Sequence, residues 1–214
     1  MIKKYFLLNA LFILSVTSYS EPLDPVKLLS NYVGIDTVNP PGNESRAVDF
    51  YAKIFEKEGI EFSSGESAPG RGNIWARIKG GDLPALILLQ HTDVVPATKK
   101  YWDTDPFVAE IKDGYLYGRG VIDMKGAGIS QLVSFIRLHR SGLSLNRDVV
   151  FVATADEEAG GMFGAGWLID NHPEIFEGAG FVINEGGSGQ IIDGEKVFAI
   201  EITQKVPVWL RFTA

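Results

Sequence analysis

The hydrophobic pattern along the chain alternates between segments with helical spacing and short apolar runs of strand length. Four segments place apolar residues at helical spacing: 25–33, 44–58, 126–138 and 164–171. Four others have the length and apolar content of strands: 74–78, 85–89, 149–153 and 181–183. Strands that alternate with helices predict parallel β-α-β units, so we expect an α/β fold with a mainly parallel sheet flanked by helices.

Local signals refine this pattern. Asp24 and Pro25 are typical of a helix N-terminus, and Gly59 and Gly142 are typical of helix C-termini. Segment 74–78 alternates apolar and polar residues, which predicts a strand with one face in solvent. The other three strands are continuous apolar runs, which predicts that they are buried.

The first 20 residues have the pattern of a secretory signal peptide. Lys3 and Lys4 precede an apolar run over 5–16, which is shorter than the ~20 residues that a membrane span needs. Small residues follow, and Ser18 and Ser20 suit cleavage after Ser20. We therefore expect a secreted or periplasmic protein without a membrane partner once residues 1–20 are removed; an uncleaved N-terminal anchor is the alternative.

Composition excludes several function classes. The chain has 20 Lys and Arg against 27 Asp and Glu, a net charge of −7, and no basic run that could follow a phosphate backbone, so nucleic acid is not expected as a partner. Cysteine is absent, which excludes disulfides, a cysteine-based zinc finger and a thiol nucleophile. Any metal must therefore be held by His, Asp and Glu.

Polar residues gather directly after the predicted strands and before the helix that begins at 126. They are His91, Asp93, Asp123, Glu157, Glu158 and Glu185. Taken singly, each could be an ordinary loop, cap or turn residue. Ligands of open α/β sheets bind outside the carboxyl ends of the strands, however, and carboxylates crowded there would repel one another without a cation. The sequence therefore predicts a metal site at this edge of the sheet.

The donor types restrict the metal. One imidazole nitrogen with several carboxylate oxygens suits Zn²⁺, with Mn²⁺ or Co²⁺ as alternatives, and a carboxylate can bridge two ions. Asp93 could accept the second N–H of the His91 ring. Because Glu157 and Glu158 are adjacent, their side chains diverge in an extended backbone, so one can bind metal while the other faces the attacking water.

Five motifs carry a family resemblance. They are LQHTDVVP at 89–96, WDTDPF at 102–107, GRGVIDMKG at 118–126, DEEAGG at 156–161 and NEGG at 184–187. In this order they resemble the zinc aminoacylase and carboxypeptidase family, which includes acetylornithine deacetylase, succinyl-diaminopimelate desuccinylase, aminoacylase and bacterial glutamate carboxypeptidase. The resemblance implies a zinc-peptidase-like catalytic domain that hydrolyses N-acyl amino acids or C-terminal peptide bonds.

The resemblance also implies a role for each matching residue. His91, Asp123 and Glu185 would bind one zinc, and Asp123 would bridge to a second zinc held by Glu158. Glu157 would be the general base that takes a proton from the attacking water and returns it to the leaving amine, and Asp93 would orient His91. We interpret Arg119 as a residue that holds its loop rather than as a substrate clamp.

The chain departs from the family toward its C-terminus. Family members carry a further zinc-binding His and another His on an inserted lid and dimerisation domain; here 21–204 would be the N-terminal part of the catalytic domain and 205–214 the start of the lid. His139 and His172 lie too far along their helices to substitute and are expected at the surface. We therefore expect at most weak activity, partial exposure of strands 149–153 and 181–183 with a tendency of the chain to associate, and a possible homodimer in the complete protein.

Alternatives remain at this point. A two-zinc aminopeptidase on a related sheet would use the same chemistry, and a secreted, non-catalytic metal- or ligand-binding protein would use the same residues. A glycosidase is disfavoured, because the adjacent Glu157 and Glu158 cannot flank a sugar from two sides.

Overall fold

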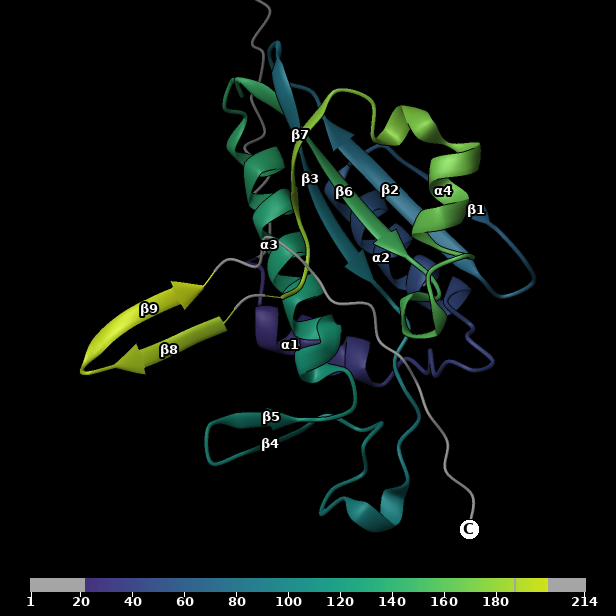
Figure 1. The fold of residues 1–214 in the computed structure, drawn as a ribbon, viewed down its shortest axis with the longest axis vertical. Coiled ribbons are helices and arrows are strands. Elements are labelled where there is room, and N and C mark those ends of the chain that lie inside the picture. The colour runs from purple at the N-terminus through teal and green to yellow at the C-terminus, as the bar shows by residue number, and fades with distance from the viewer. Residues whose placement is uncertain (1–21, 187, 200–214) are drawn as a thin grey trace, which may run out of the picture.

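The computed structural model describes residues 22–186 and 188–199, and its centre is a five-stranded sheet (Figure 1). The strand order is β1-β2-β6-β3-β7, and only β2 runs against the other four. The strands are β1 (Phe62–Glu66), β2 (Gly72–Ile78), β3 (Leu83–His91), β6 (Arg147–Thr154) and β7 (Ala179–Ile183). The predicted α/β fold with a mainly parallel sheet is confirmed.

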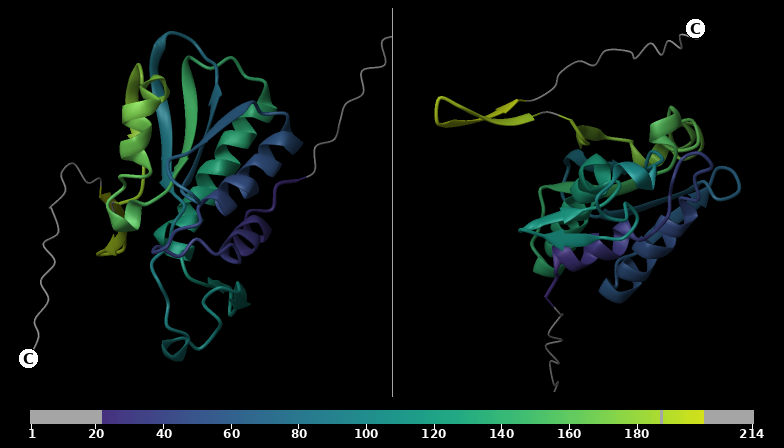
Figure 2. Two further views of the ribbon diagram at one scale, coloured as in Figure 1. Left: turned by 90° about the vertical axis from the view of Figure 1, so that its right-hand side faces the viewer. Right: turned by 90° about the horizontal axis from the view of Figure 1, so that it is seen from below.

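Helices cover both faces of this sheet, as the left view of Figure 2 shows. On one face lie α1 (Pro25–Val33), α2 (Ser45–Glu58) and α3 (Gly126–Ser141), and on the other lies α4 (Ala165–Asn171). The smaller elements are the short helices η1 (Lys99–Tyr101), η2 (Val121–Lys125), η3 (Glu157–Ala159) and η4 (Pro173–Ile175), and the hairpins β4 (Glu110–Lys112) with β5 (Tyr115–Tyr117) and β8 (Ser188–Ile192) with β9 (Glu195–Ala199).

The predicted helix ends are confirmed. The Asp24 side chain accepts hydrogen bonds from the backbone N–H groups of Val26 and Lys27, at the first turn of α1. Gly59 and Gly142 end α2 and α3 in the left-handed conformation, with φ of 66° and 60°.

Strand β6 carries the two halves of the core. Val149, Phe151 and Ala153 pack into one buried cluster with residues of α2 and α3, whereas Val150 and Val152 pack into a second cluster with Leu168 of α4 and Ile175 of η4. The expectation that 149–153 is partly exposed is therefore wrong, because β2 and β3 pair with both edges of β6 and helices cover both of its faces. Strand β7 does meet the expectation, since Phe181, Val182 and Ile183 are 61%, 54% and 49% exposed.

Strand β2 also differs from its prediction. It is largely buried rather than solvent-facing, because β1 pairs with its outer edge and α2 covers one of its faces. The sequence FSSGE of β1 has no apolar run, so the pattern along the chain does not indicate this edge strand.

Two predicted segments cannot be compared with the structure. The signal peptide at 1–20 and the start of the lid at 205–214 both lie outside the described residues. Among the helices that are described, none combines the length and the apolar character that crossing a membrane requires.

A pair of phenylalanines tests this distribution of the core. Phe151 is fully buried in the centre of the sheet and Phe181 is exposed on β7. We expect Phe151→Ala to lower the free energy of unfolding by about 3–5 kcal/mol and Phe181→Ala by about 1 kcal/mol or less. Denaturant unfolding of both variants measures the difference, and equal losses would contradict the assignment of the core.

Candidate metal centre

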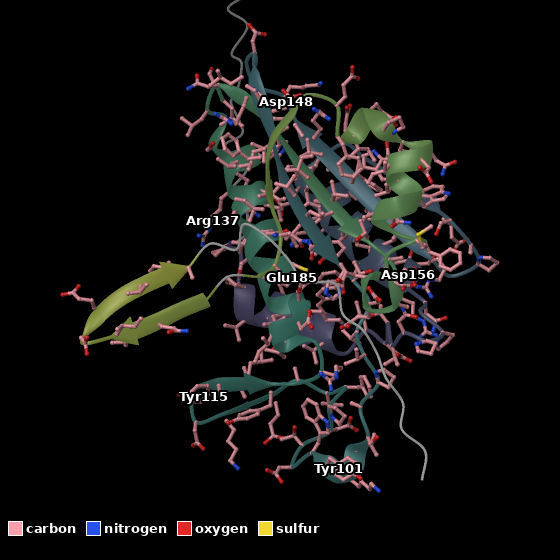
Figure 3. The ribbon with its side chains drawn as sticks, in the orientation of Figure 1. Tyr101, Tyr115, Arg137, Asp148, Asp156 and Glu185 are labelled. Atoms are coloured by element: carbon pink, nitrogen blue, oxygen red, sulfur yellow. The ribbon has the colours of Figure 1, made fainter. Side chains whose placement is uncertain are left out.

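The carboxyl ends of three parallel strands bring the predicted site residues together. His91 is the last residue of β3, Glu157 and Glu158 form the start of η3 just after β6, and Glu185 follows β7. Asp123 comes from η2, directly before α3. In Figure 3 Glu185 and Asp156 mark this end of the sheet, whereas Asp148 marks the opposite end of β6.

The imidazole of His91 is the centre of the cluster. Its Nε2 atom lies 3.0 Å from Asp123 Oδ1, 3.5 Å from Glu185 Oε2 and 3.9 Å from Glu157 Oε2. Two sets of three donor atoms lie within 4.8 Å of one another: His91 with Asp123 and Glu158, and His91 with Glu157 and Glu185. The structure therefore brings His91 and the four predicted acidic residues to one place, and Glu157 belongs to one of the two donor sets.

The orientation of the His91 ring is set by its other nitrogen. Nδ1 lies 3.0 Å from the main-chain carbonyl oxygen of Asp93 and 3.4 Å from its carboxylate. Because a carbonyl oxygen can only accept, Nδ1 carries a hydrogen and Nε2 is the atom that faces the carboxylates. Asp93 thus contacts the ring as the sequence indicates, with the main-chain carbonyl as the nearer acceptor.

The buried carboxylate of Asp93 has further partners. Its Oδ1 accepts from the backbone N–H of Glu157 at 3.0 Å, and its Oδ2 accepts from the backbone N–H of Glu158 at 3.1 Å and from Asn39 Nδ2 at 2.8 Å. One side chain therefore holds both His91 and the backbone that carries the two adjacent glutamates.

The loop that carries Asp123 is fixed on both sides of it. Gly120 is in the left-handed region at φ 81°, and a Cβ atom there would lie 2.6 Å from Val94 Cγ1, so only glycine fits. On the other side, the buried Lys125 donates from Nζ to the carbonyl oxygens of Tyr32 and Ile35, at the C-terminal end of α1. Asp123 itself is more than half exposed and faces His91.

The pKa values reflect the crowding of negative charge. Burial lowers the pKa of His91, but hydrogen bonds and charges of Asp93 and Glu185 outweigh it and raise the value to about 11. Burial and the charge of Asp123 raise the pKa of Glu158 to about 7, and burial also raises the pKa of Glu157 above its ordinary value. The cluster thus favours a positive charge at its centre, which a proton or a metal ion can supply.

The donor set fits a zinc ion. Imidazole nitrogen and carboxylate oxygen are donors that Zn²⁺ uses, and the Nδ1 hydrogen bond to a carbonyl is the usual support of a zinc-binding histidine. Which of the carboxylates would bind the ion, and which would act on water, stays a prediction.

Other residues singled out in the sequence lie away from this cluster. The Arg119 guanidinium packs over the Trp102 ring at 5.3 Å, which agrees with a role in holding its loop. His139 is exposed on α3, as expected. His172 is not simply a surface residue, because its ring packs between Trp75 at 4.9 Å and Trp167 at 5.0 Å.

Asp156 is the first residue of the DEEAGG motif, whereas three other buried polar residues beside the site were not indicated by the sequence: Asn39, Glu44 and Arg71. Their only signal is indirect, since segment 39–42 contains two prolines and a glycine and reads as a chain break.

A comparison with models of protein families assigns this chain to a family. The family model for peptidase family M20/M25/M40 matches residues 87–208, more than half of the chain and all six predicted site residues. The chain belongs to this family. The resemblance stated from the motifs is therefore confirmed.

Curated relatives in this family include enzymes named for amide hydrolysis. Human aminoacylase-1 is 33% identical over 193 residues, which cover 88% of this chain and 46% of the relative. Succinyl-diaminopimelate desuccinylase of Ehrlichia canis (strain Jake) is 32% identical over 163 residues, which cover 72% of this chain and 41% of the relative. The chain thus spans less than half the length of the curated relatives that it matches.

Solved structures agree on the fold. Human carnosine dipeptidase 1 matches with a TM-score of 0.58 and 26% identity over 75% of this chain and 38% of that one. A metallo-carboxypeptidase of the same family from Sulfolobus solfataricus matches with a TM-score of 0.66 and 23% identity over 77% of this chain and 38% of that one.

The raised pKa values predict how zinc binding responds to pH. Zn²⁺ binds neutral imidazole and ionised carboxylate, so it must displace the protons that the pKa values of about 11 at His91 and about 7 at Glu158 keep bound. We expect zinc affinity to rise by about tenfold per pH unit for each proton displaced, between pH 6 and 7. Calorimetric titration in buffers of different ionisation enthalpy counts those protons, and an affinity that does not change with pH would contradict this account of the site.

Proposed function

We propose that the chain forms the metal-binding part of a metal-dependent hydrolase that cleaves the amide bond of a small N-acyl amino acid or peptide. The observation that supports this most directly is a buried imidazole, His91, faced by four carboxylates at the carboxyl edge of a parallel sheet. Membership of peptidase family M20/M25/M40 and the similarity to aminoacylase-1 support the choice of an amide bond.

Zinc is the metal that this proposal assigns. His91, Asp123 and Glu185 would hold one ion, and Asp123 with Glu158 would hold a second, less tightly, because this second set has two of the described residues instead of three. When bound, zinc would supply Lewis-acid activation of water and of the scissile carbonyl group.

Glu157 is the residue we assign to proton transfer. Its carboxylate is about half exposed and can reach the water side of the cluster, while its backbone N–H is fixed by Asp93. Burial raises the pKa of Glu157 above its ordinary value, the direction that suits a group which accepts the proton of the attacking water and then donates it to the leaving amine. The water oxygen ends in the new carboxylate, and the amine leaves protonated.

An assay of blocked and free substrates tests the proposal. We expect the zinc-, manganese- or cobalt-loaded protein to release amino acid from N-acetyl amino acids and to lose this activity with a chelator. Hydrolysis that survives chelation, hydrolysis of free-amine peptides alone, or no amide hydrolysis by the loaded protein would contradict it.

Substitution of the adjacent glutamates separates their roles. We expect Glu157→Gln to reduce hydrolysis by at least about 10²-fold and to leave zinc content unchanged, since the amide cannot accept the proton. Glu158→Gln serves as the matched control and should lose zinc as well as activity. Elemental analysis beside the assay measures both, and loss of zinc from the Glu157 variant alone would reverse the assignment.

A further inference from the structure

A buried arginine lies behind the loop that carries Glu157 and Glu158. The side chain of Arg71 contacts four residues, Asn39, Pro41, Glu44 and Asp156, and has no role in the chemistry described above. We propose that Arg71 is a positioning residue that holds the turn at Asp156, and with it Glu157 and Glu158, in place against His91. This inference rests on the proposed function, because it concerns the geometry of the same site.

Both terminal nitrogens of Arg71 are used. Nη2 donates to Asp156 Oδ1 at 2.5 Å and lies 3.0 Å from Glu44 Oε1. Nη1 donates to the carbonyl oxygen of Pro41 at 2.8 Å and to Asn39 Oδ1 at 3.3 Å. A guanidinium can meet these partners at once because its donors are arranged in a rigid plane, which a lysine ammonium lacks.

The contact with Asp156 acts at the residue directly before Glu157. Asp156 is in the left-handed region at φ 70°, a conformation that is uncommon for a residue other than glycine and that sets the direction in which the chain leaves β6. Its backbone N–H donates to Glu44 Oε1 at 3.2 Å, and its Oδ2 accepts from the N–H of Phe163 at 3.1 Å. Contacts from the side chains of Arg71 and Glu44 therefore add to the backbone hydrogen bonds that the Asp156 carbonyl oxygen accepts from Ala159 and Gly161 within the turn.

A continuous set of hydrogen bonds connects this turn to the imidazole. Asn39 Nδ2 lies between the two acidic residues, 2.8 Å from Asp93 Oδ2 and 3.3 Å from Asp156 Oδ1. Asp93 in turn binds the backbone N–H groups of Glu157 and Glu158 and lies against His91. A shift of Asp156 would therefore reach the two glutamates through their backbone.

Charge makes the arginine hard to replace. Glu44, Asp93 and Asp156 are all at least 96% buried, and Arg71 is the cation that contacts two of these carboxylates. Burial raises the pKa of Glu44 to about 7 even though Arg71 lowers it, so a single guanidinium already only partly compensates the negative charge. Without it, buried carboxylates lose their partner, and the turn must rearrange to relieve them.

The neighbouring strand offers a matched control. Arg77 of β2 pairs with Asp148 at 2.9 Å, and it also donates to the carbonyl oxygens of Glu174 and Ile175. Asp148 lies at the opposite end of β6 from the site (Figure 3). Arg77→Met thus removes a partly buried arginine and its ion pair without contact to the metal-binding residues.

The experiment compares Arg71→Met, Arg71→Lys and Arg77→Met with the unaltered chain. Zinc affinity is measured by calorimetry, and hydrogen exchange of the Glu157 and Glu158 amides is measured in metal-free protein. We expect Arg71→Met to weaken zinc binding by about 10–100-fold, the usual effect of removing a residue that orients metal ligands. We also expect it to speed exchange of these two amides by at least about tenfold, because the turn that carries them loses its partner. Arg77→Met should change neither quantity by more than about twofold, even where it lowers the unfolding midpoint.

The conservative variant keeps the test decisive if Arg71→Met does not fold. Arg71→Lys retains the charge without the planar arrangement, so we expect intermediate zinc affinity and intermediate exchange. The inference is overturned if the Arg71 variants exchange and bind zinc as Arg77→Met does. If no form of the chain binds zinc while exchange still responds to Arg71 alone, the metal centre is wrong and the positioning of the turn stands.

Discussion

The arrangement of the site depends on the hydrogen bonds that the buried carboxylate of Asp93 accepts. This carboxylate lies in a position without solvent contact, where an ionised group is stable only with several hydrogen-bond donors. Burial would raise the pKa of Asp93, but hydrogen bonds with His91 and Asn39 outweigh this and hold it below the ordinary value. The donors that keep Asp93 ionised are the same groups whose positions define the site, so stability and geometry are coupled here.

The parallel pairing of β3 and β6 brings Asp93 close to the backbone N–H groups that it binds. His91 pairs with Thr154 at the carboxyl ends of the two strands, and the backbone N–H of Thr92 donates to the Thr154 carbonyl oxygen at 2.8 Å. The chain after β6 then turns at Asp156 and presents two consecutive N–H groups to Asp93. Strand β7 pairs with the other edge of β3 and delivers Glu185 to the same end.

Sequence reasoning could bring the candidate site residues to one end of the sheet because each lies in a local pattern. An apolar run of strand length followed closely by His or Glu is visible in the sequence, and the direction of parallel strands places those residues at one edge. The same reasoning failed for β1, which has no apolar run, and for β2, whose burial depends on pairing with β1. The expectation that segment 149–153 is partly exposed came from the family resemblance and not from its apolar pattern, which predicts burial; α2, α3 and β2 supply the cover.

The supporting network could not be predicted for a related reason. Arg71 is 32 residues from Asn39 and 85 residues from Asp156 along the chain, and a lone arginine before a strand has no distinguishing pattern. Only the fold shows that Arg71, Glu44, Asn39 and Asp156 share one buried volume behind the site. Residues that hold a site from behind are thus less visible in a sequence than those that form it.

The location of a bound ion tests the central claim most directly. Crystals of the zinc-loaded chain, measured at the zinc absorption edge, give the position of the metal from its anomalous scattering. The account predicts a peak at zinc-ligand distance, about 2.0–2.1 Å, from His91 Nε2, with carboxylate oxygens from Asp123, Glu158 or Glu185 around it. A zinc peak beside His139 or His172, with no peak beside His91, would contradict it.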